Sequence, residues 1–179
     1  MTSYVALLHS IILGEGRRVV MTDLRQMAER LGYRLPRTLV ATGNLIFEAP
    51  EQPLAEIEST LEKAFLETFG RHVDIIARSA DGWLSLAAAN PFLSAGEEDA
   101  ARVHIRVMRS PLRPDVPDGL RSYCTRGERV ALVEGDLWAD FGGKASESKL
   151  LGASTTKRLG IGTWRNWNTV KGLRAMLAG

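Results

Sequence analysis

The residues best suited to bind a ligand lie near the C-terminus, in the segment Arg165-Asn166-Trp167-Asn168-Thr169-Val170. A guanidinium beside two carboxamides at the start of a helix can hold a phosphate or a carboxylate. The first N–H groups of such a helix also point toward the anion. The sequence therefore predicts a site for a small anionic ligand, made by Arg165, Asn166, Asn168 and Lys171.

The same segment has a structural interpretation, and the residues alone leave both open. Asn168 suits the N-cap of a closing helix, in which apolar residues recur at helical spacing from Val170 to Leu177. Trp167 is predicted to be buried between that helix and a sheet, because an indole has a large apolar area. Arg165 would then join two parts of the chain through backbone carbonyls.

A second candidate is the segment Thr42-Gly43-Asn44, which lies between two apolar runs and predicts a tight hairpin. Glycine allows a positive φ there, and an asparagine side chain can bond its own backbone. Alternatively, Asn44 presents its amide to a ligand at the end of a sheet. Asn44 is therefore included among the candidate ligand-binding residues.

Patterns for metal binding and catalysis are missing from the sequence. His9, His72, His104 and Cys124 are scattered, without a paired spacing such as HxxxH or CxxC. No Gly-x-Ser-x-Gly segment marks a nucleophile, and no pair of carboxylates suggests a catalytic acid and base. We predict no metal site, no catalytic residue and no cofactor. His104 is expected to face solvent or a polar neighbour on the next strand.

The composition is that of an ordinary globular protein, with 45% hydrophobic and 25% charged residues among 179. The net charge of +2 is too small to argue for nucleic acid. Its distribution is uneven, because residues 144–179 hold seven basic residues and one acidic residue. This basic part of the chain can attract phosphates or an acidic partner. The oligomeric state does not follow from the sequence.

Three features predict a cytoplasmic protein with no membrane segment. No apolar run is long enough to cross a bilayer. The first residues, Met1-Thr2-Ser3-Tyr4, lack the basic start and apolar core of a signal peptide. A single cysteine, Cys124, excludes an internal disulfide and fits a reducing compartment.

Apolar periodicity predicts the order strand, helix, strand, strand, helix, strand, used twice along the chain. The first set comprises strand Tyr4–Leu8, a helix from Thr22 or Asp23, strands Thr38–Ala41 and Leu45–Glu48, helix Leu54–Phe69 and strand Val73–Ala77. The second runs from strand Arg102–Met108, through a hairpin around Glu134-Gly135, to strand Thr163–Arg165 and the closing helix. This is the ferredoxin-like order, an antiparallel sheet with two helices on one face.

The predicted fold is therefore α+β, with two ferredoxin-like (βαββαβ) units in tandem and a C-terminal closing helix. Residues 1–78 form the first unit and residues 102–179 the second unit with the closing helix. Residues 79–101 form a connecting helix and a linker, whose polar part is 94–101. Repetition of one pattern suggests duplication.

Five pieces of the sequence, in order along nearly the whole chain, carry a resemblance. They are Tyr4-Val5-Ala6-Leu7-Leu8, Met21-Thr22-Asp23-Leu24-Arg25, Thr42-Gly43-Asn44-Leu45-Ile46-Phe47, Asn90-Pro91-Phe92 and Arg165-Asn166-Trp167-Asn168-Thr169-Val170. With them the chain resembles the bacterial family known as domain of unknown function 1697. The resemblance implies two ferredoxin-like halves and no activity.

The chain departs from that family after its first strand. The family usually carries an Arg-Gly-Ile-Asn run there, whereas this chain has His9-Ser10-Ile11-Ile12. If the Arg and Asn of that run bind a ligand in the family, this chain lacks both contacts. Trp164 also stands where a smaller or polar residue is usual.

Taken together, the sequence favours a non-enzymatic binding module for a small anionic ligand or an acidic partner. One alternative is an enzyme acting on a phosphorylated or carboxylated metabolite, with Arg165 as the residue that clamps its charge. Another is weak, non-sequence-specific nucleic-acid binding through the basic C-terminal part. Sequence-specific RNA binding is disfavoured, because the Gly-Phe-Gly-Phe type of run used by RNA-recognition sheets is absent.

Overall fold

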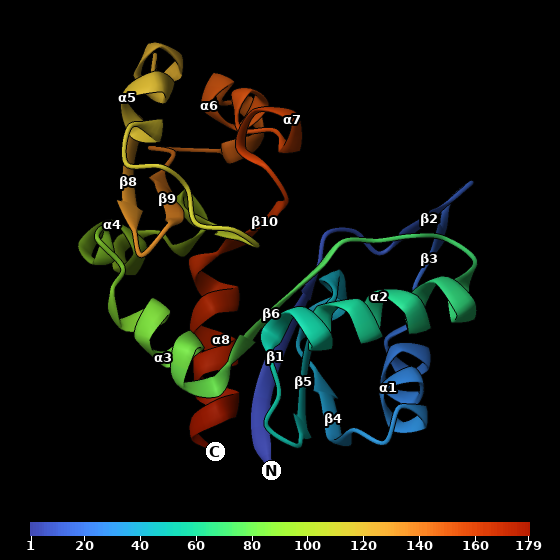
Figure 1. The fold of residues 1–179 in the computed structure, drawn as a ribbon. Helices are drawn as coiled ribbons and strands as arrows, with labels where there is room; N and C mark the ends of the chain where they lie inside the picture. Colours follow the sequence, from blue (N-terminus) through green and yellow to red (C-terminus); the bar gives the residue numbers. More distant parts are fainter. The chain divides into compact units, whose positions relative to one another are not determined.

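Helices and antiparallel sheets make up the whole chain in the computed structural model, which describes residues 1–179 (Figure 1). The fold is α+β, as predicted. The chain divides into two units, each described by itself below. Unit 1 comprises Met1–Ser85 and Leu173–Gly179, and unit 2 comprises Leu86–Gly172. None of the helices combines the length and apolar character that crossing a bilayer demands.

Unit 1 is built on a four-stranded antiparallel sheet with the strand order β4-β5-β1-β6. Helices α1 and α2 lie on one face of this sheet (Figure 1). The elements are β1 (Thr2–Leu8), β2 (Ile12–Gly14), β3 (Arg17–Arg18), α1 (Met21–Arg30), β4 (Arg34–Thr38), η1 (Val40–Thr42), β5 (Asn44–Ala49), α2 (Leu54–Phe69), β6 (Ile75–Ser79) and α3 (Ala80–Ala88), which continues into unit 2.

Residues of β1 alternate between the two faces of the sheet. Tyr4, Ala6 and Leu8 pack with the apolar stripes of α1 and α2 into one hydrophobic core. Val5 and Leu7 face the opposite side and are also buried. Burial on both faces explains why this strand is apolar throughout and was recognisable in the sequence.

Most elements of unit 1 agree with the sequence, and two segments differ. Helix α2 has the predicted limits, and Gly70 follows it in the left-handed region at φ 74°. The predicted strand 38–41 is displaced toward the N-terminus, because β4 ends at Thr38 and residues 40–42 form η1. The hairpin of β2 and β3 lies after β1, where residues 14–18 were not predicted to form strands.

Unit 2 contains a second four-stranded antiparallel sheet, with the order β10-β7-β9-β8. Its elements are α4 (Leu93–Glu98), η2 (Ala100–Arg102), β7 (Val103–Met108), α5 (Val116–Leu120), η3 (Arg121–Tyr123), β8 (Arg129–Val133), β9 (Asp136–Asp140), η4 (Ala145–Glu147), α6 (Lys149–Ala153), α7 (Thr156–Leu159), β10 (Gly162–Asn166) and α8 (Trp167–Ala178), whose last residues belong to unit 1.

The strands of unit 2 follow the sequence closely, and its helices α4, α5, α6 and α7 are shorter than α1 and α2 of unit 1. Strands β7, β8, β9 and β10 lie within one or two residues of their predicted limits. Residues 94–101, predicted as a polar linker, contain most of α4 and the start of η2. The acidic residues on the exposed side of α4 gave this short helix its linker-like composition.

Candidate functional site

The predicted anion-binding residues lie where β10 passes directly into α8. Asn166 ends β10, and its side-chain oxygen accepts a hydrogen bond from the Thr169 amide at 2.9 Å. Asn166 therefore caps α8. The prediction that Asn168 is the cap is wrong, because α8 already begins at Trp167 and Asn168 is an exposed residue of its first turn.

Trp167 is buried, as predicted, and its ring lies 6.0 Å from that of Trp138 on β9. Arg165, two residues earlier, is only 7% exposed. One terminal nitrogen of its guanidinium donates to the Thr163 hydroxyl and to the Trp164 carbonyl, both at 2.8 Å. Burial lowers the pKa of Arg165 to about 10. Arg165 thus packs inside unit 2, while Lys171 is half-buried on α8.

Asn44 belongs to unit 1 and is fully buried at the start of β5. Its amide nitrogen donates to the Leu39 carbonyl and to the Thr42 hydroxyl, both at 2.9 Å. These bonds close the turn that η1 forms before β5. They agree with the structural interpretation of the sequence, and a ligand-binding role for Asn44 stays a prediction.

His104 is half-buried, and the expected polar neighbour on the next strand is present, because Asn166 of β10 lies opposite it in the register. Its ring packs edge-on against Phe141, with centroids 5.1 Å apart, and against Trp164 at 6.4 Å. Its Nδ1 is buried without a hydrogen-bond partner. Burial lowers the pKa of His104 to about 4. Alternation along the strand predicts that His104 lies on the other face of the sheet from Val103 and Ile105. It does not show that aromatic residues pack on that second face.

A basic pocket of about 160 Å³ lies at the surface of unit 2, between α5 and α7. Arg113 and Arg158 line it, with Asp115 and apolar residues such as Leu159. The Arg158 guanidinium carbon lies 5.0 Å from the centre of the Tyr123 ring, and one of its nitrogens donates to the Tyr123 hydroxyl at 2.9 Å. These two contacts hold the cation in place.

Arg106 of β7 anchors the segment that carries Arg158. The side chain of Arg106 is buried, with the residue 2% exposed. The guanidinium of Arg106 donates to the hydroxyl of Thr156, the first residue of α7, at 3.3 Å, and to the carbonyl of Gly160, which follows α7, at 3.1 Å. Burial lowers the pKa of Arg106. This buried arginine therefore fixes the position of α7 and, through it, the position of Arg158.

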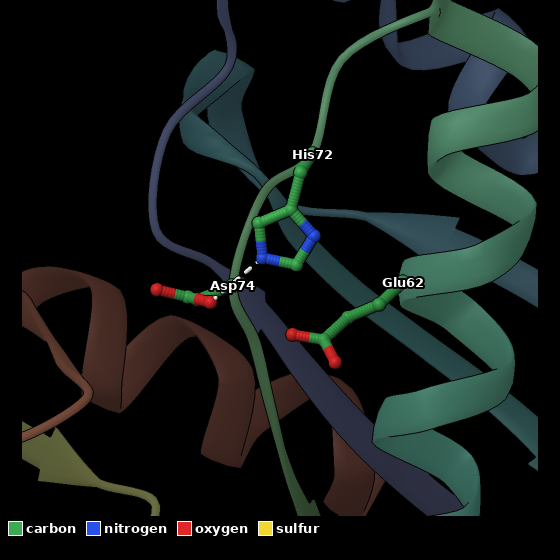
Figure 2. Close-up of side chains that lie close together, drawn as sticks. All are labelled: Glu62, His72 and Asp74. Carbon is green, nitrogen blue, oxygen red and sulfur yellow. Dashed lines mark hydrogen bonds and ion pairs between the residues drawn. The ribbon is translucent and has the colours of Figure 1, made fainter.

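Side chains of the types that bind metal ions meet in unit 1 (Figure 2). Glu62 projects from α2, and His72 and Asp74 lie in the segment that leads into β6. One ligand atom from each of the three lies within 4.8 Å of the others. No sequence pattern indicated this group, because Glu62 is ten residues away from His72 in the chain.

Comparison with known protein families identifies the family of this chain. The family described as "protein of unknown function (DUF1697)" matches residues 1–138. The chain belongs to this family. The expected membership is thus confirmed. The first four quoted sequence pieces lie within the matched residues, whereas the Arg165–Val170 segment lies beyond them.

The fold of this DUF1697 protein has a solved counterpart, the conserved bacterial protein SP0830 from Streptococcus pneumoniae. The two chains superpose with a TM-score of 0.71 over 98% of each, at 22% sequence identity. At this identity the likeness concerns the fold. No curated protein matches the DUF1697 chain.

The sequence contains signals for some of the site residues that were not predicted from it. Arg158 lies in the basic stretch that the charge distribution had singled out, but its ring partner Tyr123 is 35 residues earlier. His72 and Asp74 are two residues apart, a spacing that places two side chains on the same side of an extended segment. Glu62 could be added only by the packing of α2 against β6.

Proposed function

We propose that this protein is a non-enzymatic binding module for a small anionic ligand, and that the basic pocket of unit 2 holds it. The observation that supports this most directly is the fixed guanidinium of Arg158 facing a hollow that Arg113 also lines. Two arginines can bind a phosphate or carboxylate through charge-assisted hydrogen bonds.

The size of the pocket favours a small ligand. Pockets for drug-sized molecules measure roughly 300 to 1,000 Å³, whereas this one is about 160 Å³. Each water molecule takes about 30 Å³ in the liquid, so the pocket has room for a group of a few heavy atoms. A phosphate or a short carboxylate fits this space better than a whole nucleotide.

The arginines of the pocket have little competition for an anion. Arg113 is paired loosely with Asp115, at 3.5 Å between Nε and a carboxylate oxygen, and both side chains are more than 70% exposed. Exposed pairs of this kind contribute little free energy. An entering anion can therefore replace Asp115 as the partner of Arg113 at small cost.

Asp115 also supports a second hypothesis, an enzyme acting on a phosphorylated or carboxylated metabolite. A carboxylate on the wall of an anion pocket can exchange a proton with a bound substrate. Weak, non-sequence-specific nucleic-acid binding is a third hypothesis, supported by the basic residues of 144–179. An acidic protein partner would use the same charges.

The residues predicted from the sequence define a competing location for the anion. Arg165, Asn166, Asn168 and Lys171 remain a proposed site at the start of α8, and Asn44 a proposed ligand contact in unit 1. Asn166 already serves as the cap and Arg165 is largely inaccessible. For this reason we favour the pocket of Arg113 and Arg158.

We further propose that both units are ferredoxin-like and arose by duplication, with limits near 1–78 and 102–179 and a connection at 79–101. The support is topological. In each unit the four main strands, numbered in chain order, lie in the sheet order 2-3-1-4. A bacterial, cytoplasmic protein is proposed as well, and the single, unpaired Cys124 supports a reducing environment.

The proposed function can be tested by thermal shift with sodium phosphate, a short dicarboxylate and a short RNA. We expect phosphate or the dicarboxylate to raise the melting temperature of the wild type and of Lys157→Ala, an exposed neighbour on α7. Arg158→Ala should lose this response. Turnover of a bound metabolite would establish the enzyme hypothesis, and a response to RNA alone the nucleic-acid hypothesis.

Lys171→Ala serves to distinguish the two proposed locations. If this variant loses the anion response while Arg158→Ala keeps it, the anion binds at the start of α8. An equal response in wild type, Arg158→Ala and Arg113→Ala would rule out the pocket.

A further inference from the structure

A group of side chains in unit 1 has the chemistry of a cation site and plays no part in the proposed anion site. Glu62, His72 and Asp74 converge at the point where the segment after α2 enters β6 (Figure 2). We propose that these three residues bind a divalent transition-metal ion of the zinc type.

The ligand set matches such an ion in charge and in atom type. Two carboxylates supply two negative charges, and a neutral imidazole supplies a nitrogen. Imidazole nitrogen favours Zn²⁺ and similar ions, whereas Mg²⁺ and Ca²⁺ prefer sites made only of oxygen. Ligand atoms bound tetrahedrally at about 2.1 Å are about 3.4 Å apart. The present spacing, within 4.8 Å, needs only a small closure.

The Glu62 carboxylate and the Asp74 backbone are held by main-chain contacts, whereas the His72 side chain is largely exposed. A Glu62 carboxylate oxygen accepts from the Ile75 amide at 3.1 Å, which fixes it beside the start of β6. The Asp74 carbonyl accepts from the His9 amide at 2.9 Å, so the Asp74 backbone is fixed at the end of β1. His72 has a 61% exposed side chain, and its Nε2 already lies 2.9 Å from an Asp74 oxygen.

A separate observation is the hollow beside these residues. A pocket of about 190 Å³ is lined by His72 and Asp74, and also by His9 and Ser10 at the end of β1. Such a space can hold the water molecules that complete the coordination of a three-ligand site. His9 also lines this pocket, but it is not one of the three residues whose ligand atoms lie within 4.8 Å of one another.

One positive charge opposes the cation. Arg71 lines the same pocket. Its guanidinium reaches toward β2, where a side chain added at Gly14 would lie 3.2 Å from one of its nitrogens. Because this cation is close, we expect a metal affinity below that of closed structural zinc sites.

The test is calorimetric titration of the EDTA-treated, dialysed full chain with zinc chloride. We expect one equivalent of Zn²⁺ to bind the wild type, and to bind His72→Ala and Glu62→Gln at least about tenfold more weakly. Glu67→Gln removes an exposed glutamate from the same helix and should bind as the wild type does.

Melting curves without metal separate a ligand role from a structural one. Glu62→Gln could lower stability through its bond to Ile75, whereas the exposed His72 can be replaced without loss of packing. The decision therefore rests on His72→Ala. No heat from the wild type, or unchanged Zn²⁺ binding by His72→Ala, would overturn the proposal. Arg158→Ala should bind Zn²⁺ normally, which keeps this test independent of the anion site.

Discussion

Replacing Asp140 by asparagine removes the charge at the centre of the ion-pair network of unit 2. The Asp140 side chain is 1% exposed. It accepts two hydrogen bonds from Arg102, at 2.8 and 3.0 Å, one from Arg129 at 2.7 Å and one from the Gly142 amide at 2.9 Å. These bonds join the start of β7 to β8 and to the end of β9.

The magnitude of the effect follows from the pKa of Asp140. Burial by itself raises this pKa, but the hydrogen bonds from Arg102 and Arg129 outweigh it and lower the pKa from 3.8 to about 2. This difference corresponds to about 2 kcal/mol in favour of the ionised form in the folded protein. We therefore expect Asp140→Asn to lower the free energy of unfolding by about 2 to 3 kcal/mol at pH 7.

The pH dependence has a defined sign. Because the pKa of Asp140 is lower in the folded state, its contribution is complete well above pH 3.8 and is lost as the pH falls toward 2. At pH 3 about half of this contribution should remain. Urea unfolding followed by tryptophan fluorescence at pH 7, 5, 4 and 3 should show the wild type approaching Asp140→Asn as the solution is acidified.

Glu98→Gln is the matched control, because Glu98 contacts the same Arg102 at 3.7 Å but is 77% exposed. Exposed pairs typically contribute below 1 kcal/mol. An equal loss in Glu98→Gln and Asp140→Asn would refute the reasoning. So would a loss in Asp140→Asn below about 0.5 kcal/mol, or one that does not change between pH 7 and pH 3.

Three further predictions concern strain, close packing and a buried imidazole. Val40 has φ 48° and is 58% exposed, so Val40→Gly should raise the free energy of unfolding by about 1 kcal/mol in urea. Gly43→Ala should lower it by about 2 kcal/mol or more, because φ is 90° and a Cβ would lie 2.8 Å from that of Leu8. The lowered pKa of His104, about 4, means that the unfolded chain binds its proton first. Stability should therefore fall by at most about 3 kcal/mol from pH 6.5 to pH 4, and less in His104→Gln.

The sequence by itself determined the α+β class, the family and most of the strands. Strand β1 and helix α2 were predictable because local apolar periodicity reflects which sides of an element are buried. The burial of Trp167 followed from the apolar area of its ring. Gly70 marked the end of α2, because glycine readily adopts the left-handed conformation required there.

Only the tertiary structure decided the neighbours of the polar residues. Asn166 rather than Asn168 caps α8, because the helix starts two residues earlier than periodicity suggested. The ring of His104 packs edge-on against Phe141, which follows β9, and against Trp164 of β10. The local sequence pattern shows whether one side of a strand is apolar. It does not show which residues, distant in the sequence, pack against that side.

The same limit explains why both proposed sites came from the structure. The Arg158 guanidinium is held by Tyr123, and the Glu62 carboxylate lies near His72. Both contacts connect segments that are distant in the chain. The chemistry of a site requires a few atoms at defined separations. Those separations are set by the packing of helices on sheets, which depends on all the side chains between them and leaves no short signature in the sequence.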